Sequence, residues 1–533
     1  MKLSDFLSSI HRNFLLTISK SWHRFLIAFT LGSLSALSFA PLFIFPALLL
    51  SLCGILFLLN QEIEKQVSLT KIFWLGWWFG FGHFIAGLHW ITCALMVNLE
   101  SVWWLVPFAF LGLPAVLAIF TGVSFSLTAL WPYNGLSRGL AFGAIWIGLE
   151  WLRGHLFTGF PWNLLGYTWA FSPEMLQVAS FAGVYGLSLL ILLLAVSLTH
   201  VIGRNAFERI LSFGICLMIG LGWVWGKYRL NHQDVLFSPP FAVRLVQPNV
   251  PEDQKKTLEQ QESSFQLLLK MTAEPSSLPL RAIIWPESAV SFFLELDSSS
   301  RFLIAETLPK GALLFTGAFR RTELEGTPHK MWNSLFVVND QGEIVTHYDK
   351  LHLVPFAEYI PFREAIDTLF GKGRVRTIMM GQDLTAGINS RSLSLPQEFP
   401  VCAGLICYEA IFPHTIINPT QVRPRWIINI SNDAWFGNLS GPYQHFESAR
   451  LRAIEEGIPL VRVANTGISA VFNAYGQPLG TLGLNKQGIL DVFLPSPTSH
   501  VPFYGQWGDW ITLVLIMVIL AIAFFITFKR HQF

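Results

Sequence analysis

Long apolar stretches follow one another through the first 226 residues of the chain, and a further one closes its C-terminal end. A helix needs about 20 residues to cross the hydrocarbon core of a membrane. Stretches that reach or approach this length are residues 25–42, 43–59, 72–96, 102–130, 178–198, 210–225 and 510–528, with a weaker candidate at 140–151. Only 13% of all residues are charged, against about 25% in a typical globular chain. We therefore expect a multi-pass α-helical membrane domain of about seven helices at residues 1–226, and an eighth membrane helix at 509–533.

Basic residues predict which way these helices face. Lysines and arginines flank the expected spans at positions that all fall on one side of the membrane, namely Lys2, Arg12, Lys20, Arg24, Lys65, Lys71, Arg138, Arg204, Arg209, Lys529 and Arg530. The short loop on the opposite side, residues 97–101, contains no lysine or arginine. Loops rich in these two residues stay in the cytoplasm. Residues 227–508 are therefore predicted to form an extracytoplasmic domain.

The first apolar stretch has a second interpretation. Ser38, Phe39 and Ala40 look like the small-residue cleavage site of a secretory signal peptide. Another apolar stretch follows at once through Pro41 and Pro46, which favours a tight helical hairpin over a new N-terminus. We therefore expect the first stretch to remain as a membrane helix.

Ionisable residues inside apolar stretches are candidates for function, because such groups are costly in lipid. Glu150 and Arg153 lie three residues apart near the outer end of a predicted helix, where an ion pair at the interface is the simpler interpretation. His83 and His89 share the third predicted helix, and packing or hydrogen bonding explains them better than metal binding. The formal net charge of +2 argues against nucleic acid as a partner.

Between residues 241 and 497 the pattern changes to short β-rich runs separated by turns and helix-like stretches. The expected strands include residues 242–247, 282–285, 312–317, 335–338, 401–407 and 426–431. Residues 339–342, with the sequence Asn-Asp-Gln-Gly, form a hairpin signal before Ile344. These features predict an α/β or α+β domain whose strands are mainly buried.

Three places in this region put a reactive side chain just beyond an apolar run. Glu287 follows a proline, Lys350 lies in a mostly apolar segment with Glu358 eight residues later, and Cys407 ends a run. Each has an ordinary explanation by itself, as a solvated turn carboxylate, a structurally paired lysine or a buried thiol. Together they supply a base, a cation and a nucleophile, which are the groups that acyl transfer through a cysteine needs.

This combination resembles the nitrilase (carbon-nitrogen hydrolase) family, whose triad is glutamate, lysine and cysteine in the same chain order. Other segments extend the resemblance to the apolipoprotein N-acyltransferase family over nearly the full length of the chain, and they are residues 429–437 (NISNDAWFG), 441–445 (GPYQH), 450–455 (RLRAIE) and 465–469 (NTGIS). The resemblance implies a nitrilase-like α-β-β-α sandwich at residues 227–508. It places the membrane helices in a bacterial inner membrane and the catalytic domain in the periplasm.

The resemblance also implies a reaction. Glu287 would take the proton of Cys407, whose thiolate would attack the sn-1 ester of a phospholipid, with phosphatidylethanolamine as the expected donor. The acyl chain would then pass from the cysteine thioester to the N-terminal amine of the diacylglyceryl-cysteine of an apolipoprotein. Lys350 would stabilise the oxyanion with the help of a backbone N–H near Tyr408.

Three further residues resemble family positions that support the site. Glu358 would orient Lys350, whereas Tyr408 and Glu409 would line the pocket. No cofactor or metal is expected, since the histidines of the outer domain, His347, His352, His414 and His445, lack metal-ligand spacing and no phosphate-cradling glycine loop is present.

The chain departs from the family pattern after the first expected strand. Pro248 stands where the family usually has glycine, and Lys256 stands where a tryptophan is common, which puts a substrate-gating role there in doubt. The apolar segments 359–362 and 435–436 are candidates for loops that dip into lipid or cover the pocket, and core packing explains them equally well.

Two other functions fit parts of the pattern. A membrane-tethered nitrilase or amidase that hydrolyses small amides would keep the triad, although one helix would suffice to anchor it. A transporter or scaffold with an inactive outer domain would explain the helices. The few charges in the expected membrane helices and the intact set of Glu287, Lys350 and Cys407 argue against it.

Overall fold

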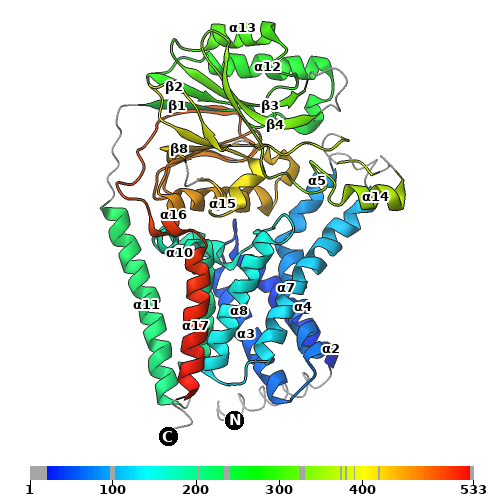
Figure 1. The fold of residues 1–533 in the computed structure, drawn as a ribbon, viewed down its shortest axis with the longest axis vertical. Helices are drawn as coiled ribbons and strands as arrows, with labels where there is room; N and C mark the ends of the chain where they lie inside the picture. The colour runs from blue at the N-terminus through cyan, green and yellow to red at the C-terminus, as the bar shows by residue number, and fades with distance from the viewer. Residues whose placement is uncertain are drawn as a thin grey trace, which may run out of the picture.

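The computed structural model describes residues 21–96, 103–201, 205–232, 241–322, 330–371, 375–377, 381–388, 390–417 and 421–528. Two bodies are stacked end to end, a bundle of helices and a sandwich of β-sheets (Figure 1). The long helices of the bundle are α2 (Ser21–Ser35), α3 (Phe45–Glu64), α4 (Leu69–Gly87), α7 (Leu113–Ala129), α8 (Leu136–His155), α10 (Ala179–His200), α11 (Ala206–Asn231) and α17 (Trp510–Phe528). The last of these returns from the sandwich to pack along α8.

Four helices in the described part of the chain are long and apolar enough to cross a membrane. They are α3, α10, α11 and the helix that η4 (Phe108–Gly112) and α7 form together. A fifth arises if α4 is joined to η2 (His89–Thr92) and α5 (Cys93–Met96), which follow it after a bend of 56°. Large apolar side chains such as Ile210 and Phe213 of α11 and Phe525 of α17 are exposed on the outside of the bundle. Such a surface suits hydrocarbon better than water.

The helices differ from the predicted spans most clearly in the third span and in the weak candidate. The single stretch expected at 72–96 bends after α4, so that Trp90 turns into the body of the protein and is buried. The weak candidate at 140–151 is part of α8, which extends further at both ends and carries Arg138, Glu150 and Arg153. Near the N-terminus, α2 and α3 pack against each other with η1 (Ala36–Ser38) between them, which is the hairpin that the prolines predicted.

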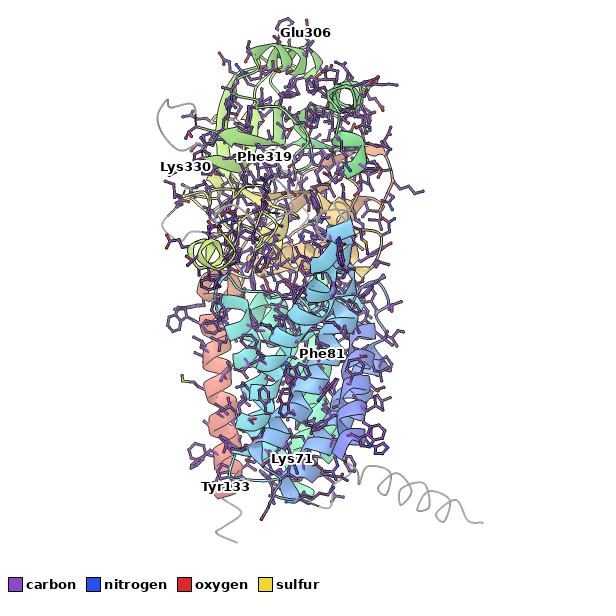
Figure 2. The ribbon with its side chains drawn as sticks, turned by 90° about the vertical axis from the view of Figure 1, so that its right-hand side faces the viewer. Lys71, Phe81, Tyr133, Glu306, Phe319 and Lys330 are labelled. Carbon is purple, nitrogen blue, oxygen red and sulfur yellow. The ribbon has the colours of Figure 1, made fainter. Side chains whose placement is uncertain are left out.

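Several of the segments that predict the orientation lie outside the described ranges, namely Lys2, Arg12, Lys20, the loop 97–101, Arg204, Lys529 and Arg530. Figure 2 shows Glu306 and Lys330 on the sandwich, and Lys71 and Tyr133 at the opposite end of the molecule, on the bundle. Lys71 therefore lies at the end of the bundle where the predicted orientation requires it, and the orientation itself stays a prediction.

The sandwich consists of two six-stranded mixed sheets. The first sheet has the order β12-β1-β2-β3-β4-β5, with β1 (Ala242–Gln247), β2 (Leu280–Ile284), β3 (Leu313–Arg321), β4 (Met331–Val338), β5 (Ile344–Asp349) and β12 (Gly488–Phe493). The second sheet has the order β11-β10-β9-β8-β7-β6, with β6 (Ser392–Leu393), β7 (Cys402–Ile406), β8 (Trp426–Ser431), β9 (Leu460–Ala464), β10 (Ser469–Phe472) and β11 (Pro478–Leu482). Parallel strands occupy the centre of each sheet.

Three apolar cores hold the layers together. Residues such as Phe315 and Trp426 fill the space between the two sheets. The helices α12 (Leu258–Thr272) and α13 (Ser298–Thr307) cover the first sheet, while α15 (Ser440–Glu456) covers the second and faces the bundle (Figure 1). The expected α/β domain is therefore an α-β-β-α sandwich, and the predicted hairpin at 339–342 joins the antiparallel strands β4 and β5.

Candidate active site

The structure brings Glu287, Lys350 and Cys407 together from three strand ends. Glu287 follows β2 by a short turn, Lys350 comes directly after β5, and Cys407 comes directly after β7. The first two side chains belong to the first sheet and the cysteine to the second. All three are buried, with 2%, 1% and 6% of their surfaces exposed. Residues that lie far apart in the chain thus meet where the two sheets face each other.

A close approach of two strands fixes the position of Glu287. Its Oε1 accepts a hydrogen bond from Asn333 Nδ2 at 2.8 Å, and its Oε2 accepts one from the backbone N–H of Asn432 at 2.8 Å. Behind it, the backbone of Gly317 binds the carbonyl of Pro286. A Cβ at position 317 would lie 2.6 Å from Glu287 Cα, so only glycine allows this approach.

Lys350 lies between two carboxylates. Its Nζ donates to Glu358 Oε1 at 2.9 Å and lies 3.6 Å from Glu287 Oε1. Glu358 is fully buried and also accepts from Asn333 Nδ2 at 3.1 Å and from the backbone N–H of Val354 at 2.7 Å. Glu358, the expected partner of Lys350, therefore contacts it directly. Asn333 links Glu358 to Glu287, because its Nδ2 donates to both carboxylates.

Cys407 lies at a sharp turn between β7 and the short helix η7 (Cys407–Ile411). Its backbone has φ +50°, a left-handed conformation that is uncommon for residues other than glycine. The Cys407 carbonyl accepts a hydrogen bond from His445 Nε2 at 3.0 Å, which helps hold this turn. The first N–H groups of a helix have no partner within it, so this turn offers donors to an oxyanion.

The three groups shift one another's pKa values. Burial would lower the pKa of Lys350, but the carboxylates of Glu358 and Glu287 outweigh it and raise that pKa above its ordinary value. Burial raises the pKa of Glu287; Lys350 opposes this shift and a hydrogen bond with the Cys407 side chain also lowers it. Burial, together with the charge of Glu287, raises the pKa of the Cys407 thiol. These shifts favour the charged form of Lys350 and the protonated form of the Cys407 thiol, and they make Glu287 a stronger base than an ordinary carboxylate.

A buried charge pair lies behind the cysteine in the second sheet. Asp433 Oδ2 accepts from Arg462 Nη2 at 2.6 Å, and Asp433 Oδ1 accepts from the Ser431 hydroxyl at 2.7 Å. Burial would raise the pKa of Asp433, but Arg462 and His445 outweigh it and hold that pKa well below its usual range. A Cβ at Gly467 would lie 2.3 Å from Asp433 Oδ2, so this pair is tightly enclosed.

Cys407, Asp433 and His445 bring one possible metal-ligand atom each to within 4.8 Å of one another. The histidine has little capacity left for an ion, because its Nε2 donates to the Cys407 carbonyl and its Nδ1 lies 3.1 Å from Arg462 Nη2 and 3.0 Å from Asp433 Oδ1. Burial and Arg462 lower the pKa of His445, which favours a neutral ring. The donor set therefore fits a hydrogen-bond network better than a metal centre.

Glu409 and Tyr408 support the site from different sides. Glu409 Oε1 accepts from the Tyr348 hydroxyl at 2.8 Å, from Arg391 at 2.8 Å and from the backbone N–H of Leu351 at 3.0 Å. It thereby ties the cysteine turn to the segment that carries Lys350. The Tyr408 hydroxyl donates to the carbonyl of Gly159 in the bundle at 3.3 Å, so Tyr408 lies at the contact between the two bodies.

Several buried residues complete the site although sequence analysis gave them no role. Asn333 lies inside β4 and Arg462 inside β9. The other three, Asn432, Asp433 and His445, lie in segments that carried the family resemblance. For Asn432, Asp433 and His445 the available signal was this resemblance, together with the polar residues that follow the apolar strand β8. Lys256, which departs from the family pattern, is exposed and lies in the bend before α12.

The segments suspected of covering the pocket separate into two kinds. Phe362 directly precedes α14 (Arg363–Phe370) and is 71% exposed, whereas Ile360 two residues earlier is buried. Phe436 packs against Trp90, with ring centroids 4.8 Å apart. Core packing therefore explains the second segment, and the first presents an aromatic side chain to the outside.

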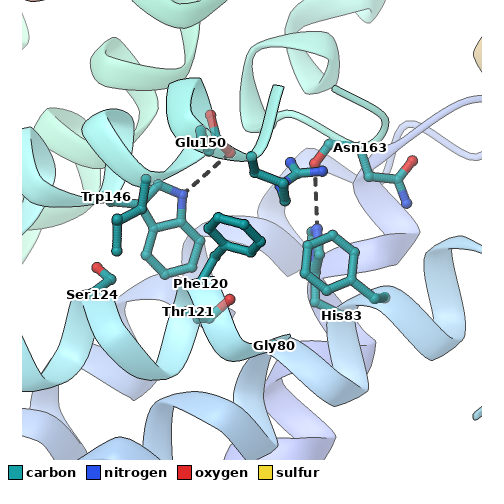
Figure 3. A pocket seen from close by; sticks show the side chains of 11 residues that line it. Gly80, His83, Phe120, Thr121, Ser124, Trp146, Glu150 and Asn163 are labelled. Carbon is teal, nitrogen blue, oxygen red and sulfur yellow. Dashed lines mark hydrogen bonds between the residues drawn. The ribbon is translucent and has the colours of Figure 1, made fainter. Parts of the chain in front are cut away.

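Glu150, Arg153 and His83 line a pocket between α4, α7 and α8 (Figure 3). His89 lies outside it, with its Nδ1 2.8 Å from the Ala86 carbonyl. Glu150 Oε1 accepts from Trp146 Nε1 at 3.2 Å, and His83 Nε2 lies 3.5 Å from the Asn163 carbonyl. Arg153 donates to the carbonyls of residues 160 and 162 at 2.6 and 2.8 Å. Glu150 and Arg153 thus bind different partners, and His83 has a hydrogen-bonding role.

Two family models match consecutive parts of the chain. Residues 31–197 match the apolipoprotein N-acyltransferase N-terminal domain, and residues 242–498 match the carbon-nitrogen hydrolase family. A protein of Rhodopseudomonas palustris named apolipoprotein N-acyltransferase is 37% identical over 515 residues, covering 94% of this chain and 95% of the relative. One of the same name from Bradyrhizobium diazoefficiens is 38% identical over 525 residues, with 96% of both chains covered. The solved structure of XC1258, a CN-hydrolase superfamily protein from Xanthomonas campestris, aligns with 49% of this chain and 91% of that chain, at 18% identity and a TM-score of 0.33.

Proposed function

This chain belongs to the apolipoprotein N-acyltransferase family and is an acyltransferase, and we propose that it moves a fatty acyl chain from a phospholipid to an apolipoprotein through a thioester on Cys407. The observation that supports this most directly is the convergence of Glu287, Lys350 and Cys407 in one buried site. The proposed location is a bacterial inner membrane, with the sandwich in the periplasm.

In the first half-reaction, the Glu287 carboxylate accepts the thiol proton of Cys407 as the sulfur attacks the sn-1 ester carbonyl of the phospholipid. A carboxylate whose pKa is raised by burial is a better base for this transfer. The C–O bond to the glycerol then breaks, Glu287 returns the proton to the leaving oxygen, and a lysophospholipid departs. Phosphatidylethanolamine is the proposed donor.

In the second half-reaction, the amine of a diacylglyceryl-cysteine at an apolipoprotein N-terminus attacks the thioester carbonyl. Glu287 accepts a proton from this amine, and the sulfur leaves as the thiol of Cys407. The Lys350 ammonium, kept charged by Glu358 and Glu287, stabilises the oxyanion of both tetrahedral intermediates together with the backbone N–H of Tyr408.

The bundle gives this chemistry its access to lipid. Both proposed substrates keep their acyl tails in the bilayer, and the bundle holds the sandwich directly above the apolar helices (Figure 1). Phe362 and Phe157, both strongly exposed and with ring centroids 6.4 Å apart, lie on the sandwich and the bundle respectively. An amidase acting on small soluble amides would gain nothing from this arrangement.

Acyl transfer by purified protein tests the proposal. Wild-type enzyme should move a labelled acyl chain from phospholipid to the amine of a diacylated lipopeptide, and Cys407→Ala should abolish the transfer. Cys402→Ala is the matched control, because Cys402 is also buried and lies only five residues away in β7. Transfer by Cys407→Ala, or release of ammonia from small amides with no acyl transfer by the wild type, would contradict the proposal.

A further inference from the structure

The bundle and the sandwich meet at an aromatic joint that we define as Trp90, Trp162, Phe436, Gln444 and His445. One oxygen lies at its centre, since Gln444 Oε1 accepts from Trp162 Nε1 at 2.7 Å and from Trp90 Nε1 at 3.2 Å. Both indoles and the glutamine are buried. Two separate segments of the bundle therefore bind the same atom of helix α15 in the sandwich.

Each tryptophan is itself held in place by the bundle. Trp90 lies in η2, at the bend that follows α4, and a Cβ at Gly441 of α15 would lie 2.7 Å from its ring. Trp162 lies in the loop after α8, where its carbonyl accepts from Arg153 Nη1 at 2.8 Å. Arg153 also lies over the Phe84 ring of α4, 5.0 Å from its centroid. Arg153 thus links α4, α8 and the joint.

On the other side, the joint contacts the backbone of the nucleophile. His445 follows Gln444 in α15, and its Nε2 donates to the Cys407 carbonyl at 3.0 Å. Phe436 packs between the two groups, with its ring centroid 4.8 Å from that of Trp90 and 5.4 Å from that of His445. Gln444 and His445, which are neighbours in α15, therefore connect the indoles of the bundle to the backbone of Cys407.

The hydrogen bond from His445 affects the peptide group between Cys407 and Tyr408, which carries the proposed oxyanion donor. In a planar trans peptide, the C=O and the N–H point in opposite directions. The bond from His445 to the Cys407 carbonyl therefore also sets the direction of the Tyr408 N–H, which belongs to the same peptide. Because Cys407 has a left-handed backbone, this peptide needs an external anchor to keep its orientation.

We propose that Gln444 and His445 are positioning residues that aim the Tyr408 N–H at the oxyanion, and that Trp90 and Trp162 hold them in place from the bundle. The inference rests on the proposed function, since it concerns the oxyanion donor of that reaction. It means that packing of the membrane helices sets the geometry of a site in the outer domain.

Two rates measured on the same thiol test this inference. One is the rate of thioester formation on Cys407 in a single turnover with phospholipid and no acceptor, which passes through an oxyanion. The other is the rate of Cys407 alkylation by iodoacetamide, a substitution at saturated carbon that forms no oxyanion. Loss of one oxyanion donor costs about 100- to 1,000-fold, and a misaligned donor costs less. Gln444→Leu should slow thioester formation about tenfold to a hundredfold and leave alkylation within about twofold of wild type.

Further variants keep the test independent of folding. Gln444→Glu retains an oxygen that accepts from both indoles, so thioester formation should recover to within a fewfold of wild type. Trp162→Phe keeps the ring and removes one donor, so its effect should lie between those of wild type and Gln444→Leu. It serves as the deciding variant if Gln444→Leu does not fold.

Three results would overturn the inference. They are equal slowing of thioester formation and alkylation, a Gln444→Glu variant as slow as Gln444→Leu, and unchanged thioester formation in Gln444→Leu or Trp162→Phe. The proposed function fails separately, through transfer by Cys407→Ala. If thioester formation requires Cys407 but does not change when Gln444 is substituted, the positioning role is refuted and the proposed function stands.

Discussion

The two sheets hold their parts of the active site by different means. In the first sheet, Glu287, Lys350 and Glu358 bind one another or share Asn333, so side-chain charges fix the geometry. In the second sheet, the nucleophile is positioned by its backbone, through the left-handed turn at Cys407 and the hydrogen bond on its carbonyl. The first sheet therefore sets the charge of the site, and the second sets the position of the sulfur and of the proposed oxyanion donor.

The buried charges next to the two sheets are also paired in different ways. Asp433 and Arg462 neutralise each other directly at 2.6 Å, which leaves them little net effect on a reacting group. Lys350 instead faces two carboxylates, and in the proposed mechanism proton uptake by Glu287 leaves the charge of Lys350 available to the oxyanion. Substitutions of the charged side chains in the first sheet should therefore act mainly through electrostatics, and substitutions in the second sheet mainly through geometry.

The largest effect is expected for Lys350→Met. This change removes the cation proposed for oxyanion stabilisation, so kcat/KM for acyl transfer should fall at least about 100- to 1,000-fold. It also leaves Glu287 and Glu358 as neighbouring buried carboxylates, which should lower the free energy of unfolding by about 3–5 kcal/mol near neutral pH. Lys310→Met, at an exposed position before β3, is the control. Activity within tenfold of wild type would remove the distinction between the sheets.

A smaller effect is expected for Gly317→Ala, which adds one methyl group behind Glu287. The new Cβ would lie 2.6 Å from Glu287 Cα, so the turn that carries the base must shift. We expect kcat/KM to fall about tenfold or more, since small displacements of a catalytic group are costly. Gly214→Ala is the control, because no atom lies within 4 Å of its added Cβ. Equal activity of the two variants would show that the base tolerates displacement.

The pH dependence should move when the charge of Glu358 is removed. Glu287 must be deprotonated to act as a base, so kcat/KM should rise with pH through the pKa of Glu287. The charge of Glu358 contributes to raising this pKa, so in Glu358→Gln the acid limb should move to lower pH. Glu306→Gln, at an exposed position of α13, should leave the limb in place. A limb that stays fixed or moves to higher pH in Glu358→Gln would argue against Glu287 as the titrating base.

The smallest effect is expected for Tyr408→Phe, next to the second sheet. The hydroxyl makes one long hydrogen bond to Gly159 at 3.3 Å, and the ring keeps its packing against Phe412. Since the backbone N–H of Tyr408 remains, kcat should stay within about threefold of wild type, a loss of less than about 1 kcal/mol. A hundredfold loss of kcat would show that this sheet also acts through side-chain polarity.

The three central residues could be predicted because they lie where apolar strands end. A strand end is visible in sequence as a break in an apolar run, and Glu287, Lys350 and Cys407 each stand just beyond one. The family resemblance then gave each a role. The hairpin between β4 and β5 was also predictable, since its turn residues determine the local backbone.

The supporting residues could not be predicted because their partners come from distant segments. Asn333 stands in the middle of β4 and looks like an ordinary polar residue until Glu287 and Glu358 are placed beside it. Gln444 binds two indoles that lie more than 280 positions away in the chain, so its sequence neighbours do not reveal its role. The bend after α4 was missed for another reason. Residues 72–96 are mostly apolar from end to end and look like one continuous span, although Gly87 and His89 stand at the bend.

Mass spectrometry of the protein after incubation with phospholipid in the absence of acceptor is the most direct test of the thioester. Wild-type protein should carry one fatty acyl group, proteolysis should place it on Cys407, and hydroxylamine or a diacylated lipopeptide should remove it. Cys402→Ala should carry the same group. An acyl group on another residue, or lipopeptide acylation by a protein that never carries one, would contradict a thioester on Cys407.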